Sequence, residues 1–278
     1  MYSSHAPIFS DLYEIETSIP FLQCINLKSL LRWTRYALGG FLPDLFINPR
    51  NATNTISQKD IFGKEELNDF PPARLDEALK QVRASDAGQK VNFTLHFEPY
   101  QLNPDFPDSV DKNEWYLANK HMGNADAQRL FQAHMTDLLA PAGVALNFGG
   151  LMGNTLHAHR VIQHFQDAEH DGGSARTNRL VEALYAAYFA RAQHPAADET
   201  LVAACAEAGI AEDEARRVVA DKELGLRQVR DRLRMNGQDV DAVPVVMVEG
   251  KRRDLTLTGA KEVADYVKAL ETIVKESS

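Results

Sequence analysis

The 278-residue sequence predicts an α/β fold in which a helical domain interrupts a small sheet. Three observations lead to this prediction. Residues 91–97 alternate apolar and polar side chains, which is typical of a half-buried strand. Residues 245–257 contain two short apolar runs on either side of a charged turn. The long stretch between these strand signals, residues 105–237, has apolar residues at helical spacing together with capping and glycine signals.

The first clear element begins at Pro71-Pro72, which suits the first turn of a helix because a missing N–H costs nothing there. Four apolar residues mark one face of this helix: Leu75, Ala78, Leu79 and Val82. Gly88 follows the helix, and the strand of residues 91–97 then ends before Pro99. A helix followed by a strand is typical of the second half of a βαβ unit. We therefore expect a first strand upstream, parallel to residues 91–97 and beside them in the sheet.

Capping signals divide the middle stretch into helices. Asp111 with Glu114 is typical of a capping box, Asn154 or Thr155 is expected to cap a second helix, and Asp198 a third. One helix between the first two caps is expected to turn six residues toward the core: Leu130, Phe131, His134, Met135, Leu138 and Leu139.

The last part of the chain predicts two strands and a helix. Residues 245–248 form a short apolar run, residues 249–253 a turn, and residues 255–257 a second strand. A final helix follows Gly259, and its apolar residues recur at helical spacing: Val263, Tyr266, Val267, Leu270 and Val274.

In order, the predicted elements are a strand, a helix and a strand, then a helical block, then two strands and a helix. This is the order of a thioredoxin-like fold with an inserted helical domain. We assign residues 71–104 and 238–278 to a thioredoxin-like core and residues 105–237 to the helical insert. Residues 1–70 form a divergent, poorly patterned N-terminal region.

Charge and hydropathy exclude several classes of partner. The formal net charge of -9 argues against nucleic acid or an anionic membrane, because binding to phosphates requires clustered Lys and Arg. No apolar run is long enough to span a bilayer, and the first residues lack the basic region of a signal peptide. We expect a cytoplasmic protein that binds neither nucleic acid nor a membrane.

The two cysteines, Cys24 and Cys205, are far apart in the sequence, and no CxxC motif occurs. Cys205 follows Leu201 by four residues on an apolar helix face, so we interpret it as a core residue. For Cys24 we favour a buried or incidental cysteine, with a lone nucleophile as the alternative. We expect no metal site, because His157 and His159 would point about 200° apart on a helix.

Several motifs together indicate a family. In chain order they are FEPYQLNP (97–104), FGG (148–150), GNTL (153–156), AHR (158–160), VEAL (181–184), AYF (187–189), Val243-Pro244, GKRRD (250–254) and GAK (259–261). Through them residues 71–275 resemble the DsbA-like, FrnE-type thioredoxin proteins, and the last two motifs are similar to fungal members in particular.

The resemblance implies an oxidoreductase class, with protein thiol–disulfide exchange or glutathione-linked chemistry. Family members use a Cys-x-x-Cys at the N-terminus of the first helix, where the helix dipole lowers the pKa of a thiol. Val243-Pro244 matches the proline that presents backbone to the substrate after a cis peptide bond. Asn154, Thr155 and His159 match the insert motif and are further candidates for the substrate groove. The implied partners are a thiol-containing protein or a glutathione-like small molecule, and no resident cofactor is expected.

The sequence departs from the family at the catalytic positions. Counted back from the predicted helix, the two family cysteines fall on Glu65 and Asn68. A carboxylate and an amide cannot form a mixed disulfide, so the catalytic residues of this chain are unknown. Residues 56–63, where the family has a buried strand, are largely polar.

Three interpretations remain open. The chain is a member of the oxidoreductase class that is redox-inactive as written, a non-catalytic thioredoxin-fold binding protein, or an active oxidoreductase whose N-terminal region has been misread from the gene. The sequence alone names neither the substrate nor the oligomeric state.

Overall fold

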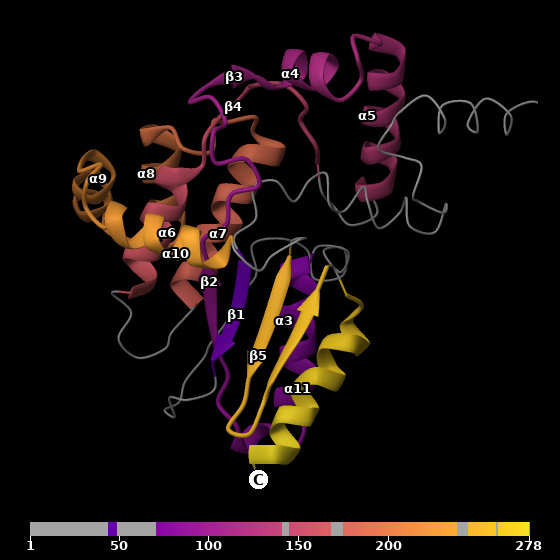
Figure 1. Cartoon of the computed structure of the whole chain (residues 1–278), viewed down its shortest axis with the longest axis vertical. Helices are drawn as coiled ribbons and strands as arrows, with labels where there is room; N and C mark the ends of the chain where they lie inside the picture. The colour runs from indigo at the N-terminus through magenta and orange to yellow at the C-terminus, as the bar shows by residue number, and fades with distance from the viewer. Residues whose placement is uncertain are drawn as a thin grey trace, which may run out of the picture. The chain divides into compact units, whose positions relative to one another are not determined.

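The computed structural model describes residues 44–48, 71–140, 145–167, 175–237, 244–259 and 261–277. Four strands form one sheet in the order β2-β1-β5-β6, as Figure 1 shows: β1 (Asp44–Asn48), β2 (Thr94–Glu98), β5 (Val245–Glu249) and β6 (Asp254–Thr258). Strands that lie before and after the helical insert therefore share one sheet, as the sequence predicts.

The described strand upstream of α3 differs from the prediction in its direction, while residues 56–63, where the family has a strand, lie outside the described residues. The described strand, β1, lies at residues 44–48 and pairs antiparallel with β2, with Leu45 opposite Phe97. Its parallel neighbour is β5, with Leu45 opposite Val246. The expected parallel pairing with residues 91–97 is thus wrong. A short apolar run shows that a segment can be a buried strand, but it carries no information about the direction of that strand.

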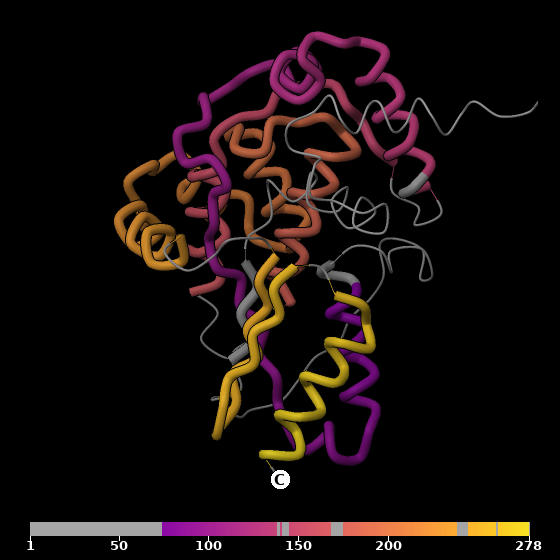
Figure 2. The backbone as a smooth tube through the Cα atoms, turned by 45° about the vertical axis from the view of Figure 1, so that its right-hand side comes forward, coloured from indigo at the N-terminus to yellow at the C-terminus, as the bar shows by residue number. Residues whose placement is uncertain are grey.

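Two helices complete the part of the molecule that contains the sheet. They are α3 (Pro71–Arg83) and α11 (Val263–Ser277); α11 packs against both α3 and β5, and Figure 2 shows the two helices on the same side of the sheet. The predicted apolar face of α3 is confirmed, because Leu75, Ala78, Leu79 and Val82 are all buried. A short 3-10 turn, η2 (Gly88–Lys90), leads from α3 toward β2. No helix among the described residues is long and apolar enough to cross a membrane.

The insert between β2 and β5 is mainly helical. Its elements are β3 (Val110–Asp111), α4 (Lys112–Asn119), α5 (Ala125–Leu139), β4 (Leu151–Met152), α6 (Leu156–Asp167), α7 (Ala175–Tyr185), the π-helix η4 (Ala186–Ala190), α8 (Asp198–Glu207), α9 (Glu212–Ala220) and α10 (Leu226–Asn236). Its core consists of residues from α6 to α10, among them Val161, Phe165, Leu180, Leu184, Leu201 and Val218.

Two of the predicted helix caps are confirmed and one is wrong. Asp111 accepts a hydrogen bond from the Glu114 N–H, and Asn154 accepts one from the Leu156 N–H. Asp198, by contrast, is the first residue of α8, whose N-cap position is Ala197 without a side-chain cap.

The buried face of α5 is rotated from the predicted one. Met135 is fully buried, but Leu130 is 58% exposed and His134 is also exposed. The side chains of Leu138 and Leu139 lie outside the described set. A buried glutamine takes the place of Leu130, because the Gln128 amide donates to both the backbone oxygen and Oδ1 of Asn113 on α4.

Candidate functional site

The start of α3 and the start of β5 lie at the same end of the sheet. Arg74, in the first turn of α3, is only 3% exposed and donates from Nη1 to the Lys261 carbonyl at 3.2 Å. The same nitrogen contacts the Glu262 carboxylate at 3.0 Å. These two residues closely follow Gly259, whose N–H donates to the Pro244 carbonyl at 2.8 Å. Arg74 thus holds the beginning of α3 to residues 261 and 262, which follow the residue that bonds to Pro244.

Pro244 is buried immediately before β5. Val243 lies outside the described residues, so a cis Val243-Pro244 bond stays a prediction. The same holds for Glu65, Asn68 and Cys24, whose placement the structure does not describe. The described part of the site therefore consists of the start of α3, the contacts of Arg74 with Lys261 and Glu262, and Pro244.

Asn154 anchors residues 104–110, which we call the strap. Its Nδ2 donates to the Pro104 carbonyl at 2.9 Å and to the Phe106 carbonyl at 3.3 Å. Its backbone N–H donates to the Pro107 carbonyl at 2.9 Å. Three main-chain oxygens of the strap are thus held by a single asparagine.

The neighbouring glycine lets the strap approach closely. A Cβ on Gly153 would lie 1.9 Å from the Asp108 carbonyl oxygen and 2.3 Å from His194 Nε2. His194 Nδ1 accepts the Ala196 N–H, so Nε2 carries the proton and donates to the Asp108 oxygen at 2.8 Å. Gly150 is restricted in the same way, because it has φ +82° and its Cβ would lie 2.1 Å from the Ala192 oxygen. Both glycines are thus required by close backbone approaches.

Two further residues of the predicted groove, Thr155 and His159, lie close to Asn154 in the sequence. Gln101 donates from Nε2 to Asn154 Oδ1 at 2.8 Å and to Thr155 Oγ1 at 3.4 Å. His159 follows in the first part of α6 and is 2% exposed. No hydrogen bond between described residues joins Pro244 to Asn154, Thr155 or His159. The structure therefore separates the candidates into an anchor in the insert and a proline in the sheet.

Burial keeps His159 neutral. Desolvation lowers its pKa to about 4, and a contact with the Tyr100 backbone acts weakly in the opposite direction. Neither ring nitrogen makes a hydrogen bond of normal geometry with another described residue. His159 is therefore uncharged at neutral pH and cannot attract an anionic ligand by charge.

Cys205 is a core residue, as predicted. It is fully buried on α8 beside Leu201, Ala204 and Ala208, which are fully buried too. Desolvation, followed by the charge of Glu214, raises the pKa of its thiol to about 12. Only the thiolate attacks a disulfide, so Cys205 is inert at neutral pH.

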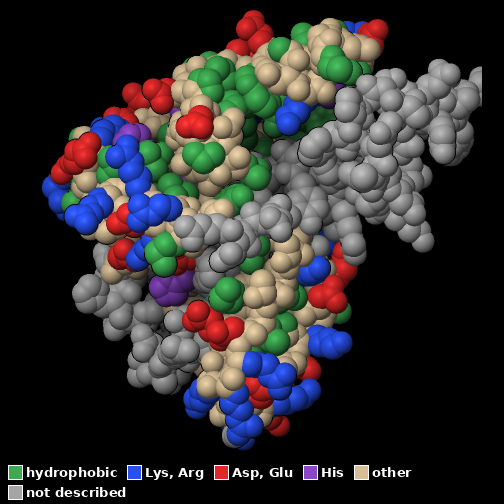
Figure 3. Space-filling view, in the orientation of Figure 1, with side chains coloured by type: hydrophobic (Ala, Val, Ile, Leu, Met, Phe, Trp, Pro, Cys, Tyr) green, Lys and Arg blue, Asp and Glu red, His purple; other side chains and the backbone are tan. Residues whose placement is uncertain are grey.

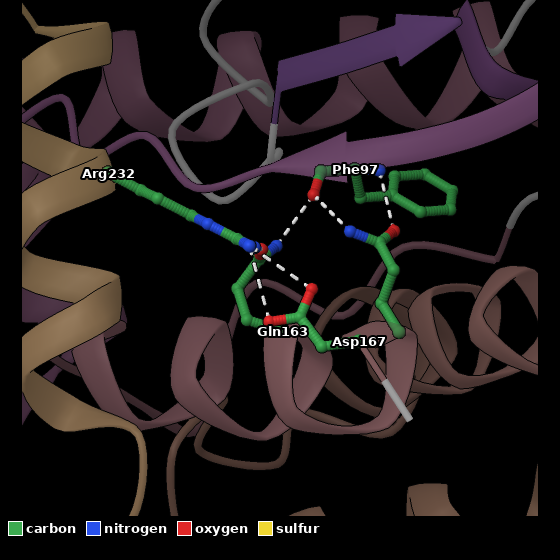
Figure 4. Close-up of polar contacts among 5 residues, drawn as sticks. Phe97, Gln163, Asp167 and Arg232 are labelled. Carbon is green, nitrogen blue, oxygen red and sulfur yellow. Dashed lines mark hydrogen bonds and ion pairs between the residues drawn. The ribbon is translucent and has the colours of Figure 1, made fainter. Parts of the chain in front are cut away.

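Sequence reasoning missed the contacts that join β2 to the insert, drawn in Figure 4. Gln166 on α6 pairs with the backbone of Phe97, accepting its N–H at 2.7 Å and donating to its carbonyl at 2.9 Å. Gln163 donates to the same carbonyl at 2.6 Å. Arg232 on α10 contacts Gln163 and forms an ion pair with Asp167 at 3.1 Å. We call these five residues the joint. Their only signal in the sequence is two glutamines within the buried face of a helix.

Lys112 was missed as well. Its side chain is buried within the insert, where Nζ donates to the Tyr188 carbonyl at 3.1 Å and to the Asn147 carbonyl at 3.3 Å. Nζ also lies 3.9 Å from the centre of the Tyr188 ring. Tyr188 lies in the last turn of the π-helix η4, where main-chain carbonyls have no partner within the helix, and the ammonium group supplies one. Desolvation lowers the pKa of Lys112 to about 8.

The comparisons with known proteins agree with the fold. Residues 73–271 match the family model of the DSBA-like thioredoxin domain. Among solved structures, the chain is similar to one described as a probable DsbA oxidoreductase from Streptomyces coelicolor, with a TM-score of 0.57 and 21% identity. That match covers 75% of this chain and 85% of the other, and at this identity it shows the fold alone. No curated protein matches the sequence.

Proposed function

Because the chain belongs to the DSBA-like thioredoxin domain family, we propose that it uses the family's site for binding and does not itself exchange disulfides. The bound partner is a thiol-containing protein or a glutathione-like small molecule, recognised next to Pro244 at the beginning of α3. Within the family, the motifs of the insert and of the C-terminal hairpin favour the FrnE-type, fungal-like members.

The observation that carries the proposal is the lack of a usable pair of thiols. Disulfide exchange needs one thiolate to attack and a second thiol to resolve the mixed disulfide. The sequence has only Cys24 and Cys205, and the thiol of Cys205 is buried with its pKa raised to about 12. Cys24 acting alone would stop at a mixed disulfide.

A second observation supports retention of the binding site. A buried arginine is costly unless it is paired, and Arg74, buried at the start of α3, is paired with the Lys261 carbonyl and the Glu262 carboxylate. Its role is to hold α3 against the segment next to Pro244, which is the arrangement that a substrate-presenting proline needs.

Insulin reduction by the purified chain tests the missing activity. We expect the background rate for the chain itself, and the same rate for the variants Cys24→Ser and Cys205→Ala. Robust turnover that disappears in Cys24→Ser would make Cys24 a true nucleophile and the proposal wrong.

Restoring the cysteine pair tests the site. If Glu65 and Asn68 occupy the family's cysteine positions, the double variant Glu65→Cys/Asn68→Cys gains insulin reductase activity. The single variant Asn68→Cys is the matched control and stays at background. A double variant that folds but remains inactive would remove the support for a site at the start of α3.

Direct binding completes the test. Titration calorimetry of the unaltered chain with reduced glutathione, and with a short cysteine-containing peptide, should detect binding of at least one of them. Pro244→Ala should weaken that binding, whereas Gly149→Ala in the insert should not. Equal binding by both variants would place the ligand elsewhere.

A further inference from the structure

Arg160 holds the turn between α9 and α10 from within the insert. It lies in α6 and is fully buried. Its Nη1 donates to the Val218 carbonyl at 2.8 Å and to the Leu224 carbonyl at 3.2 Å, and its Nη2 donates to the Val219 carbonyl at 3.2 Å. Val218 and Val219 lie in the last turn of α9, where carbonyls lack a partner within the helix. Arg160 therefore caps the end of α9 and attaches the turn of residues 221–225 to α6.

The same turn has a second attachment, to α8. Lys222, within the turn, forms an ion pair with Asp198 in the first turn of α8. Figure 3 shows basic and acidic side chains side by side on the surface at the left of the view, where α9 and α10 lie. Two basic side chains, Arg160 and Lys222, thus connect the turn to the rest of the insert.

His157 contacts the first of these attachments. Its Nδ1 accepts the Arg160 Nε–H at 3.3 Å. Because an arginine side chain does not lose its proton in a protein, Nδ1 must be the unprotonated nitrogen, and the imidazole in this bond is neutral. Protonation of His157 is therefore incompatible with the bond, and it would place two positive groups against each other.

Among the described residues, charged groups from four parts of the chain act on His157. Arg160 on α6 and Lys222 in the turn disfavour the imidazolium. Asp198 on α8 and Asp108 in the strap favour it. Desolvation is the largest effect, and together with the two basic groups it lowers the pKa of His157 below its ordinary value of 6.5. The ring is thus neutral at neutral pH and becomes charged in acid.

We propose that His157 is an acid-sensitive switch that controls how tightly the turn of residues 221–225 is attached. At neutral pH the ring accepts the Arg160 Nε–H. In acid the imidazolium repels Arg160 and competes with Lys222 for the Asp198 carboxylate. A single proton therefore weakens both attachments of the turn.

The other end of α10 is attached by different residues. Arg232 forms an ion pair with Asp167 on α6 at 3.1 Å, and Asn236 donates from Nδ2 to the Pro99 carbonyl at 2.9 Å. Protonation of His157 breaks neither contact. The switch therefore loosens the beginning of α10 and leaves its end in place.

Hydrogen exchange of the full chain at about pH 7 and about pH 5 tests the proposal. The amides of Leu224 and Leu226 report the turn, because they donate to the Asp221 and Glu223 carbonyls. After correction for the intrinsic effect of pH on exchange, their protection should fall about fivefold or more in acid. Amides at residues 232–236 should change by less than about twofold.

The sign of the stability effect follows from the same proton. Folding lowers the pKa of His157, so the unfolded chain binds this proton more readily than the folded chain does. As the pH falls below about 6.5, the stability contributed by neutral His157 is progressively lost. Urea unfolding of the chain and of a variant without this histidine should therefore diverge in acid, against the unaltered chain.

His157→Gln is that variant, because a glutamine oxygen accepts the Arg160 N–H and does not titrate. It should lose the additional exchange of the turn in acid. His164→Gln changes another half-buried histidine of α6 and is the matched control, which should respond like the unaltered chain. Circular dichroism at both pH values checks that each variant is folded.

Nitrogen NMR of the unaltered chain tests the bond without any substitution. At about pH 7 the spectrum of His157 should show a neutral ring with its proton on Nε2, because Nδ1 accepts from Arg160. A proton on Nδ1 at neutral pH would overturn the proposal. So would a turn that does not respond to acid, or a response that persists in His157→Gln.

Discussion

At the scale of single residues, Gly153 shows how closely two backbones approach in the insert. Only hydrogen atoms fit between its Cα and the Asp108 carbonyl, because an added Cβ would lie 1.9 Å from that oxygen. The clash is with main chain and with a histidine held at both ring nitrogens, so neither neighbour can move aside easily. The glycine is therefore a structural requirement of the strap.

We expect Gly153→Ala to lower the free energy of unfolding by roughly 2 kcal/mol or more, because the strap must separate from the insert. Gly149→Ala, four residues earlier in the insert, is the matched control. Its Cβ would meet only the Asn147 side chain at 3.4 Å, an ordinary contact. Urea unfolding of both variants tests the difference, and equal stability would contradict the role given to Gly153.

Lys112 predicts a dependence of stability on pH. Its pKa is lowered to about 8 in the folded state from 10.5, so between these values the unfolded state binds more protons. Stability contributed by this group therefore rises as the pH increases from about 8 toward 10.5. The rise should be on the order of 1–2 kcal/mol, less than desolvation alone would give, because two carbonyls and a ring stabilise the ammonium.

The variant Lys112→Met isolates this effect. Other groups that titrate in the same range contribute equally to both proteins, so the difference in unfolding free energy between the chain and the variant reports Lys112. This difference should move in favour of the unaltered chain between about pH 8 and about pH 10. A difference that is constant with pH would mean that the Lys112 pKa is not lowered.

Residue patterns predicted the apolar core well and the buried polar groups poorly. Leu75, Phe165 and Cys205 are buried where helical spacing placed them. Arg74 and Lys112 are buried too, although charged residues are normally assigned to the surface. Each is buried only because carbonyl oxygens distant in sequence accept its hydrogen bonds, and such partners are invisible until the chain is folded.

At the scale of elements, the joint connects β2 to the insert through the backbone of Phe97. The Gln166 amide offers the same donor and acceptor that a neighbouring strand would offer. We expect Gln166→Leu to destabilise the protein by about 2–4 kcal/mol, because the N–H of Phe97 is left buried without a partner. Gln81→Leu on the exposed side of α3 is the control and should change stability by less than about 0.5 kcal/mol.

Hydrogen exchange distinguishes a local from a general effect of this substitution. Loss of the Gln166 contact should increase exchange at the Phe97 amide more than at amides in α11. Uniform acceleration throughout the described elements would show that Gln166 contributes to overall packing only, and not specifically to the edge of β2.

The elements themselves were predicted unevenly. The helix α3 and the strands β2, β5 and β6 carry clear periodicity, and the structure contains each of them. The direction of β1 and the face of α5 were predicted incorrectly. In both cases the local pattern allows more than one solution, and long-range pairing selects between them: the register with Phe97 for β1, and the bond from Gln128 to Asn113 for α5.

At the scale of the whole molecule, the insert leaves the sheet after β2 and returns to it before β5. The joint adds side-chain contacts where the insert meets β2. We therefore expect the insert and the sheet to unfold together, because opening either one exposes the buried groups of the joint.

Cys205 is a probe of this cooperativity. In a Cys24→Ser background it is the only thiol, and it is fully buried in the insert. Its labelling by Ellman's reagent should be slow, with a urea dependence equal to that of global unfolding. Faster labelling with a weaker urea dependence would show that the insert opens independently of the sheet.

Asn154 and His194 hold the strap through its carbonyl oxygens, at residues 104, 106, 107 and 108. Apart from Phe106, which packs its ring on Trp115, the side chains of residues 104–109 are exposed. Amino acids can therefore be exchanged along this segment with little effect on its attachment. The strap is thus a suitable place to graft an affinity peptide onto the protein. Its attachment depends on the position of the backbone and not on the identity of the side chains.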